Sequence, residues 1–353
     1  MKVLVAMSGG VDSSVAAGLL VEQGHEVVGA TLKLWGGVSD SGCCSVADVD
    51  DARRVAQLLG IDHHVFNYTD EFNRHVVEPF IDAHVRGQSP NPCIECNRHI
   101  KFDLLFERAE RLGFDAVATG HHARVVEHDG RRELLRGADA QKDQSYVLGY
   151  LDDAHLRKLV LPIGDMEKSE VREHAARFGL PTWDKPDSQD VCFIEASKGR
   201  EVFLRRRIAL TPATIVDRRT GEVLGQTDAA ELMTVGQRRG VLPDRDGEKR
   251  FVSSVDVSAG RVEVGRLEDV VVSRLRLIQT SLSFTHDALA NGARVLVQWS
   301  AHGTAQIATL RYDGEWYLDL AKPARPVAPG QSVVMYRADE PSIVEGAAIV
   351  SRA

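Results

Sequence analysis

Residues 8–14 of the chain read Ser-Gly-Gly-Val-Asp-Ser-Ser, a combination suited to binding a phosphate group. Glycine tolerates positive φ and lets backbone N–H groups approach an anion closely. A following helix N-terminus adds partial positive charge, and the serine hydroxyls add donors. The segment lacks the Gly-Lys-Ser/Thr ending of the common nucleoside-triphosphate loop. The structural alternative is a tight strand-to-helix turn with Asp12 as N-cap, but such a turn does not need this whole combination.

Cysteine thiols are the second set of candidate reactive groups. The five cysteines lie at positions 43, 44, 93, 96 and 192, and this odd, uneven set argues against a disulfide framework. The Cys93-x-x-Cys96 spacing is that of half a zinc site, although no second C-x-x-C pair exists to complete one. Cys192, alone before Phe-Ile, is also typical of a small buried apolar residue. Cys43-Cys44 is either a redox pair or a chance neighbour pair.

The elements that must position these groups follow from hydrophobic periodicity. In residues 1–200, short apolar runs alternate with amphipathic stretches, which predicts βαβ units around a parallel sheet. We expect strands at Val3–Met7, Glu26–Leu34, His63–Tyr68 and Ala116–Thr119, and helices at Asp12–Glu22, Ala47–Leu59, Asp70–Arg86 and His99–Leu112. The segment Gly87–Asn97, rich in Pro, Asn and Cys, is expected to be an irregular loop that carries chemistry.

From about Thr211 the pattern becomes that of short strands. Residues 214–225 predict a hairpin around Arg219-Thr220-Gly221, and residues 253–265 predict another around Ala259-Gly260. From Val270 onward, short strands alternate with Gly, Asp and Pro turns, which favours a small all-β barrel or sandwich. We therefore expect an α/β catalytic domain (1–200), a central linking module (201–268) and a C-terminal β-barrel domain (269–353).

The composition is that of an ordinary globular protein, with 43% hydrophobic and 27% charged residues. No apolar run is long enough to span a membrane, and Gly and Asp interrupt the N-terminal apolar stretch, so we expect a cytoplasmic protein. The net charge of −8 gives no overall attraction to nucleic acid. An RNA-binding face would need a local basic patch, and the candidates are residues 205–207 and Arg238-Arg239, unless these are simply solvated charges.

Residues 8–14 resemble the signature of the PP-loop ATP pyrophosphatases, which split ATP between the α- and β-phosphates and pass AMP to a carbonyl or carboxyl oxygen. Six further segments, in order along nearly the whole chain, resemble the bacterial tRNA-specific 2-thiouridylase family. They are PNPCIECNRHIKF (90–102), ATGHHAR (118–124), LLRGADAQKDQSY (134–146), DSQDVCFI (187–194), TVGQRRG (234–240) and PGQSVVMY (329–336).

The resemblance implies an adenine-nucleotide α-hydrolase-like catalytic domain, a C-terminal β-barrel and a tRNA-uridine 2-sulfurtransferase activity. ATP with Mg²⁺ would adenylate the C2 oxygen of wobble uridine 34 and release pyrophosphate. Cys192 would carry a persulfide and Cys96 would be the nucleophile. The terminal sulfur either attacks C2 directly or leaves as sulfide when Cys96 attacks the persulfide and a Cys96–Cys192 disulfide forms.

The resemblance also assigns binding positions. Those for ATP align with Ala6, Met7, Ser8, Gly9, Gly10, Val11, Asp12, Ser13, Leu32 and Gly120. Those for the target base align with Asn91, Pro92 and Cys93, and those for the rest of the tRNA with His121, Lys142, Asp143, Gln144 and Gln331. The implied partners are a tRNA anticodon loop, of lysine, glutamate or glutamine acceptors, and a cysteine desulfurase or sulfur-relay protein.

The chain departs from the family pattern at two places. Many relatives carry Asp at the position of Cys93, and some carry Arg-Tyr near Ser300-Ala301. The first departure raises the alternative that Cys93, Cys96 and Cys192 bind a [4Fe–4S] cluster whose open iron carries hydrosulfide. Cys93 as a spare thiol, as a redox guard for Cys96 or as a zinc ligand are the competing interpretations. The competing functions are another adenylating amidotransferase or ligase and a non-catalytic metal-dependent or iron–sulfur RNA-binding protein.

Overall fold

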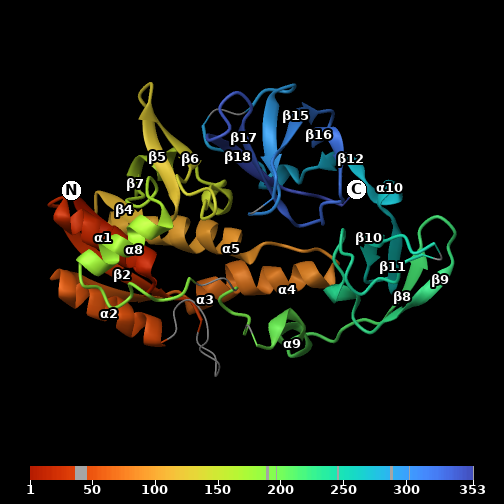
Figure 1. Ribbon diagram of the computed structural model, residues 1–353, viewed down its shortest axis with the longest axis horizontal. Helices are drawn as coiled ribbons and strands as arrows, with labels where there is room; N and C mark the ends of the chain where they lie inside the picture. Colours follow the sequence, from red (N-terminus) through yellow and green to blue (C-terminus); the bar gives the residue numbers. More distant parts are fainter. Residues whose placement is uncertain are drawn as a thin grey trace.

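The computed structural model describes residues 1–35, 46–187, 191–195, 197–244, 246–286, 289–301 and 303–352. Its N-terminal region is built on a parallel sheet with strand order β3-β2-β1-β4-β7 (Figure 1). The strands are β1 (Lys2–Ala6), β2 (Glu26–Lys33), β3 (Asp62–Asn67), β4 (Ala116–Thr119) and β7 (Leu159–Val160). The four predicted strands are confirmed to within one residue at each end. The chain runs from β1 outward to β3 and then returns to the other side of β1 for β4, which is the reversal at which open parallel sheets bind ligands.

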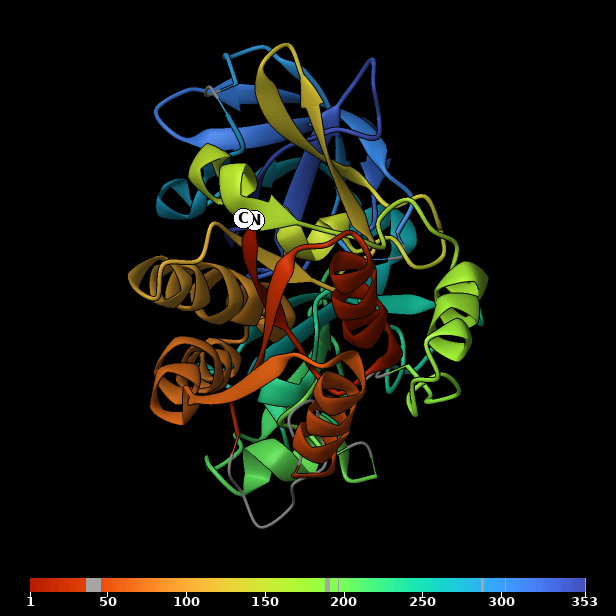
Figure 2. The same cartoon turned by 90° about the vertical axis from the view of Figure 1, so that its left-hand side faces the viewer.

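Helices cover both faces of this sheet (Figures 1 and 2). On one face lie α1 (Val11–Glu22), α2 (Val46–Leu59) and α8 (Lys168–Arg177). On the other lie α3 (Thr69–Phe72), the π-helix η1 (Asn73–Val77), α4 (Glu78–Val85), α5 (Pro92–Glu95), the π-helix η2 (Cys96–Leu104) and α6 (Leu105–Arg111). Each face of the sheet has its own apolar core, and successive side chains of β1 point to opposite faces. Val3 and Val5 pack into the core beneath α1, α2 and α8, whereas Leu4 packs into the core on the other face.

The expectation of an irregular segment over Gly87–Asn97 is wrong in its second half. Asn91 is the N-cap of α5, and its side-chain oxygen accepts a hydrogen bond from the backbone N–H of Cys93 at 3.1 Å. Pro92 takes the first helical position, where its missing N–H costs nothing. The cysteines of the C-x-x-C pair therefore lie on a helix, and the chain continues without a break through η2 into α6.

A hairpin that the sequence analysis did not anticipate links the catalytic domain to the C-terminal region. Its strands are β5 (Ala123–His128) and β6 (Arg131–Arg136), and an antiparallel bridge joins Leu135 to Ile343. The 3₁₀-helix η3 (Ser145–Leu148), α7 (Asp153–Lys158) and α9 (Gly199–Arg205) complete this part of the chain. The hairpin stands above the parallel sheet beside the C-terminal strands in Figure 1.

The central module is a four-stranded sheet with order β10-β11-β8-β9. Both predicted hairpins are confirmed, one between β8 (Ala213–Asp217) and β9 (Val223–Thr227), the other between β10 (Arg250–Asp256) and β11 (Arg261–Arg266). Two short helical turns, η4 (Ala230–Leu232) and α10 (Leu267–Val270), flank the sheet. Its apolar core is separate from the cores of the neighbouring regions.

The C-terminal region is a seven-stranded antiparallel sheet that curls back on itself. Its elements are β12 (Val272–Arg276), η5 (Gln279–Ser281), β13 (Ser283–Phe284), β14 (Arg294–Gln298), β15 (Gln306–Tyr312), β16 (Trp316–Ala324), β17 (Ser332–Arg337) and β18 (Val344–Ile349). Leu277, directly after β12, bridges to Val350, directly after β18, so the first strand returns to the end of the last. The expected barrel-like β domain is confirmed. Among the described helices, none is long and apolar enough to cross a membrane.

Candidate active site

The phosphate-binding segment follows β1 at the reversal point of the parallel sheet. Gly9 has φ +75°, and a Cβ at this position would lie 2.3 Å from the carbonyl oxygen of Asp48. Gly120 follows β4, and a Cβ there would lie 2.5 Å from the backbone nitrogen of Ser13. Both glycines are therefore required by the close approach of backbone to backbone. Ala6 and Met7, at the end of β1, pair with Ala30 of β2, and Leu32 lies two residues further along β2.

The start of helix α1 has the features of an anion site. Gly10 is the N-cap and provides no side-chain cap, so the structural alternative with Asp12 as N-cap is wrong. Val11 opens the helix and is buried. The Ser13 hydroxyl accepts a hydrogen bond from the N–H of Ser8 at 3.1 Å, which folds the loop over the helix start. The backbone N–H groups of the first turn and the helix dipole thus remain for an anionic ligand.

The carboxylate of Asp12 is held by two cationic or hydrogen-bonding partners. Lys168, at the start of α8, places its ammonium 2.6 and 2.8 Å from the two carboxylate oxygens, and His122 Nε2 lies 3.3 Å from Oδ1. Burial alone would raise the pKa of Asp12, but hydrogen bonds from His122 and Lys168 outweigh it and lower the pKa. Asp12 is therefore ionised at neutral pH, as a ligand for a metal–nucleotide complex must be.

The same lysine connects the phosphate loop to the segment that precedes Cys192. Lys168 Nζ lies 2.8 Å from Asp187 Oδ1, and Lys142 Nζ lies 2.8 Å from Asp187 Oδ2. Burial alone would raise the pKa of Asp187, but hydrogen bonds from Lys142 and Lys168 lower it to about 2. One ammonium group thus bridges Asp12 of the loop and Asp187 of the cysteine-bearing segment. No sequence motif marks Lys168, and its partners lie far away in the chain, so its role could not be predicted from the sequence.

A second lysine ties the loop to helix α2. Lys185 Nζ donates to the carbonyl oxygen of Gly9 at 2.9 Å and to the carboxylates of Asp48 and Asp51 at 2.7 Å each. Burial lowers the pKa of Lys185, but the hydrogen bonds that it donates to Asp48 and Asp51 outweigh burial and raise the pKa, so the lysine is charged. Its hydrogen bond to the carbonyl oxygen of Gly9 fixes the loop at the residue that has positive φ.

The two cysteines of the C-x-x-C pair have different environments. Cys93, in the first turn of α5, is exposed, whereas Cys96, at the start of η2, is buried and packs in the larger core of the catalytic domain. Next to Cys96, Glu95 pairs with His99 at 3.3 Å, and Asp103 pairs with the other nitrogen of that imidazole at 3.1 Å. Hydrogen bonds to Asp103 and Glu95 raise the pKa of His99 to about 9, so it carries a positive charge one helical turn from Cys96.

Cys192 is half-buried and is anchored through the residue that follows it. The Phe193 ring lies in an aromatic cluster, with centroids 6.1 Å from Trp35, 5.8 Å from Phe72 and 5.3 Å from Phe80. Because Trp35 follows β2, the cluster holds the Cys192 segment at the carboxyl edge of the parallel sheet, where the phosphate loop also lies. Residues 188–190 of this motif and the Cys43-Cys44 pair lie outside the described residues.

The structure does not arrange the three described cysteines as cluster ligands. Among the described residues, which include Cys93, Cys96 and Cys192, no group of three or more His, Cys, Asp or Glu side chains could hold a metal ion. The residues present therefore do not fit a [4Fe–4S] cluster in this conformation. They do fit ATP with Mg²⁺, because the glycine loop, the open helix start and the ionised Asp12 carboxylate form a phosphate and metal-binding donor set.

The target-base segment is braced by the C-terminal barrel. Gln331 Nε2 donates to the carbonyl oxygen of Ser89 at 2.7 Å, and the N–H of Ser89 donates to the carbonyl oxygen of Pro329 at 2.8 Å. Gly330, with φ +88°, packs against the backbone of residues 89 and 90. Gln331 therefore positions the segment that leads into Asn91, in addition to its expected contact with RNA.

The other residues expected to contact tRNA lie around the phosphate loop. His121 is buried, and burial, with Lys101 and His122 nearby, holds its pKa well below the ordinary value. Asp143 is an internal anchor that accepts hydrogen bonds from Arg136 and from backbone N–H groups. Gln144 is exposed, and its side-chain oxygen accepts from the N–H of His122 at 2.9 Å. Lys142 and Gln144 thus contact the two residues, Asp187 and His122, that surround Lys168 and Asp12.

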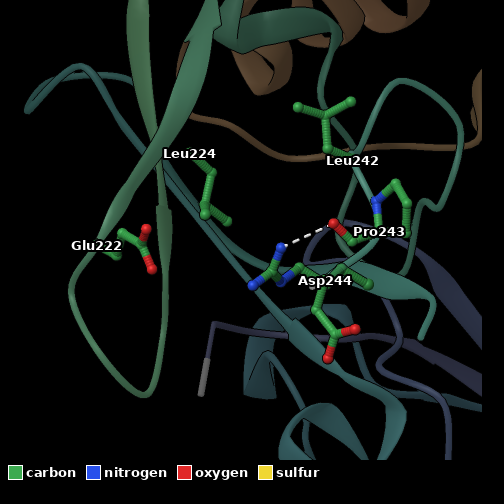
Figure 3. Close-up of a pocket in the computed structure, with 6 residues that line it drawn as sticks. Glu222, Leu224, Leu242, Pro243 and Asp244 are labelled. Atoms are coloured by element: carbon green, nitrogen blue, oxygen red, sulfur yellow. Dashed lines mark hydrogen bonds between the residues drawn. The ribbon is translucent and has the colours of Figure 1, made fainter. Parts of the chain in front are cut away.

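Two hollows lie outside this arrangement of loop and thiols. One lies in the central module, between β9 and residues 242–244, and contains none of the predicted site residues (Figure 3). The guanidinium of Arg250 is already used there, by the carbonyl oxygen of Pro243 at 3.0 Å and by Asp217 at 3.0 Å. The other lies directly beside Phe193.

Family models and similar proteins both relate the chain to enzymes that modify tRNA. A family model described as the tRNA methyl transferase HUP domain matches residues 1–196, and one described as the tRNA methyl transferase PRC-barrel domain matches residues 201–266. The chain is 46% identical over 350 residues to the tRNA-specific 2-thiouridylase MnmA of Mycolicibacterium smegmatis, covering 96% of each chain. It is also 46% identical over 347 residues to the protein of the same name from Chloroflexus aurantiacus, again covering 96% of each chain.

Solved structures resemble the chain much more distantly. The U34-tRNA thiolase NcsA from Methanococcus maripaludis, with its [4Fe-4S] cluster, aligns with a TM-score of 0.36 and 18% identity over 54% of this chain and 61% of that chain. So slight a likeness carries no argument about the cysteines of this site.

Proposed function

Because the chain belongs to the tRNA-specific 2-thiouridylase family, we propose that it uses ATP to replace the C2 oxygen of the wobble uridine of tRNA with sulfur. The single observation that carries the proposal is the Lys168 bridge. It joins Asp12 of the phosphate loop to Asp187 of the segment that bears Cys192. Base activation and sulfur delivery therefore share one edge of the sheet.

The first half of the reaction is the transfer of AMP to the C2 oxygen of uridine 34, with pyrophosphate as the leaving group. The glycine loop and the N-terminus of α1 bind the phosphates through backbone N–H groups. The Asp12 carboxylate would hold Mg²⁺, which would supply charge neutralisation for the pyrophosphate leaving group. When no nucleotide is bound, Lys168 neutralises the charge of Asp12. When ATP is bound, its ammonium group supplies positive charge to the phosphates. Transfer of AMP converts a poor leaving group, the carbonyl oxygen, into a good one.

The second half delivers sulfur from a persulfide on Cys192. The terminal sulfur attacks C2, AMP leaves, and the thiolate of Cys96 attacks the Cys192 sulfur so that the C2 thiocarbonyl is released and a Cys96–Cys192 disulfide forms. In the alternative order, Cys96 attacks the persulfide first and the released sulfide attacks C2. Either order needs an external thiol reductant to restore the cysteines.

Several finer features belong to the same proposal. The sulfur donor is a cysteine desulfurase or a sulfur-relay protein, and the acceptors are lysine, glutamate and glutamine tRNAs, bound through the anticodon loop. The compartment is the cytoplasm, and the domain boundaries are 1–200, 201–268 and 269–353. Cys93 stands where many relatives carry Asp, and its exposed position beside the target-base segment makes it a thiol neighbour of the base rather than a proton carrier.

The two family-model descriptions name methyl transfer, but this reaction explains fewer features of the site than thiolation does. A methyl donor needs neither a loop for splitting ATP nor a pair of thiols. An amidotransferase would need an amine or glutaminase site, which the sequence does not suggest. A non-catalytic RNA-binding protein would not need an ionised Asp12 in the glycine loop.

Mass spectrometry of tRNA nucleosides, after incubation with ATP, Mg²⁺ and a sulfur source, tests the proposal directly. We expect 2-thiouridine to appear together with AMP and pyrophosphate. Asp12→Ala should abolish pyrophosphate release and leave tRNA binding largely intact. Cys96→Ser should be inactive but should still accept a persulfide at Cys192. Methylated instead of thiolated nucleosides, or wild-type pyrophosphate release by the Asp12 variant, would refute the proposal.

A further inference from the structure

A polar pocket lies beside Phe193, the residue that follows the persulfide cysteine of the proposed mechanism. It is formed by three parts of the chain: Trp35, which follows β2, the residues after Cys192, and α9 with the two arginines that follow it. Phe193, the immediate neighbour of Cys192, forms part of its wall. The reaction described above does not use this pocket.

Aromatic rings form the floor of the pocket. Trp35 and Phe193 have ring centroids 6.1 Å apart, and Phe193 and Phe203 have centroids 5.0 Å apart. The Arg207 guanidinium lies over two of these rings, 3.9 Å from the centroid of Phe203 and 5.5 Å from that of Trp35. Phe193 and Phe203 are buried, whereas Trp35 and Arg207 reach the solvent. A ring and a guanidinium plane are the surfaces on which unpaired nucleobases stack.

The charges around the pocket are mostly positive, although the chain as a whole carries a net charge of −8. Lys198, Arg206 and Arg207 line it, against the single carboxylate of Glu195. Glu195 pairs with Lys198 at 2.5 Å and with Arg206 at 3.6 Å. The Lys198 and Arg206 side chains are 44% and 58% exposed, so both retain donors for an added anion.

We propose that this pocket binds one unpaired nucleotide of the RNA substrate, next to the nucleotide that is thiolated. The base stacks on the Trp35–Arg207 surface, and its phosphate pairs with Lys198 and Arg206. The proposal rests on the proposed function, because it places a substrate nucleotide beside Cys192. A nucleotide held at this point fixes the anticodon loop relative to the sulfur atom that must reach the target base.

The arginine run on and after α9 provides a matched pair of variants. Arg206 lines the pocket, whereas its neighbour Arg205 is engaged by Glu201 at 2.8 Å and Asp228 at 2.7 Å and does not line it. We expect Arg206→Ala to weaken binding of an anticodon stem-loop RNA by about fivefold or more and to lower the slope of log affinity against log salt by about one. Arg205→Ala should change neither.

Stacking is tested with Trp35→Leu and Trp35→Phe. Loss of the stacking surface in Trp35→Leu should weaken RNA binding by about 5- to 100-fold, whereas Trp35→Phe should keep most of the affinity. Because Trp35 belongs to the aromatic cluster, circular dichroism and thermal unfolding are measured for both variants. Photochemical crosslinking of the stem-loop to wild-type protein, followed by peptide mapping, covers the case in which Trp35→Leu does not fold. A crosslink to the peptides of Trp35 or Phe193 supports the proposal.

Three results would overturn this proposal. One is equal RNA affinity and salt slope for Arg206→Ala and Arg205→Ala. Another is crosslinking only to peptides outside the pocket. The third is unchanged RNA binding by Arg206→Ala together with slower persulfide loading from a sulfur-donor protein, which would make the pocket a protein docking site. RNA binding is measured without ATP or sulfur, so failure of the wild-type enzyme to thiolate would refute the proposed function and leave this test intact.

Discussion

Replacing Lys168 with methionine removes one charge while keeping much of the side-chain volume. The ammonium lies within 2.8 Å of both Asp12 oxygens and of Asp187 Oδ1, and the side chain is only 12% exposed. The variant therefore leaves two partly buried carboxylates close together with one cation fewer. We expect two separate losses, one in stability and one in pyrophosphate release.

The stability loss can be bounded from the pKa of Asp187. Lowering this pKa from its ordinary 3.8 to about 2 corresponds to roughly 2.4 kcal/mol at neutral pH. Lys142 and Arg172 share the carboxylate with Lys168, and solvent screens part of the interaction, so Lys168→Met should cost about 1 kcal/mol through Asp187. A carboxylate with a lowered pKa stabilises the fold above its unfolded pKa and loses that contribution as pH falls through the folded pKa. The wild type should therefore lose this stability between about pH 4 and 2, and the variant should lose less.

The activity loss should be larger than the stability loss. Removing one preorganised donor to a developing charge in a water-poor site lowers the rate by about 10²- to 10³-fold. The assay is ATP-dependent pyrophosphate release in the presence of tRNA, with urea unfolding on the same samples. Arg177→Met is the matched control, because Arg177 lies on the same helix α8 and pairs with Glu22, away from the loop. Pyrophosphate release within threefold of wild type by well-folded Lys168→Met protein would refute a role for this lysine at the phosphates.

Three further predictions concern the thiols, the brace and the imidazolium. Cys192→Ser should eliminate 2-thiouridine while pyrophosphate is still released, as measured on the same reaction mixtures, because transfer of AMP to the C2 oxygen precedes the attack of sulfur; thiolation by this variant would exclude the persulfide route. Gln331→Ala removes the 2.7 Å hydrogen bond to Ser89, worth about 1 kcal/mol, and should raise the KM for tRNA about fivefold with an unchanged KM for ATP in steady-state assays. Hydrogen bonds to Asp103 and Glu95 raise the pKa of His99 to about 9, so the stability that it contributes is complete below pH 6.5 and is lost as pH rises through 9. The free energy of unfolding, measured in urea, should fall between pH 6 and pH 9.5, and the fall should be about 1–2 kcal/mol larger in wild type than in His99→Gln. Equal pH profiles for the two proteins would contradict this assignment.

The sequence predicted those parts of the molecule whose signal is local. Strand β4 matches the expected Ala116–Thr119 at both ends, because an apolar run buried on both faces has no other stable location. The phosphate loop was predictable because Gly9 must adopt positive φ. The helix that begins at Asn91-Pro92 was missed although its signal was present. An Asn N-cap followed by Pro at the first helical position marks a helix start, and the polar composition of the segment obscured it.

Contacts between distant segments could not be predicted. Lys168 meets Asp12 across 156 positions of the chain, and neither residue has neighbours that indicate the pairing. A lysine at a helix start resembles any solvated surface charge until the fold brings carboxylates to it. The arginine run 205–207 was equally ambiguous, since only the structure separates Arg205, used by Glu201 and Asp228, from Arg206 and Arg207, which line the pocket.

The hydrogen bond between Gln331 and Ser89 can form only late in the synthesis of the chain. The two residues are 242 positions apart, and at a synthesis rate of about 5–20 residues per second the ribosome makes the second about 10–50 seconds after the first. During that interval the core beneath α1, α2 and α8 can form, but the core on the other face of the sheet still lacks its residues from β17 and β18, and the segment leading to Asn91 has not yet met its support. We therefore expect the nascent chain to acquire its substrate-binding geometry in one late step, when β17 docks, so that tRNA encounters the finished enzyme rather than a partly built one.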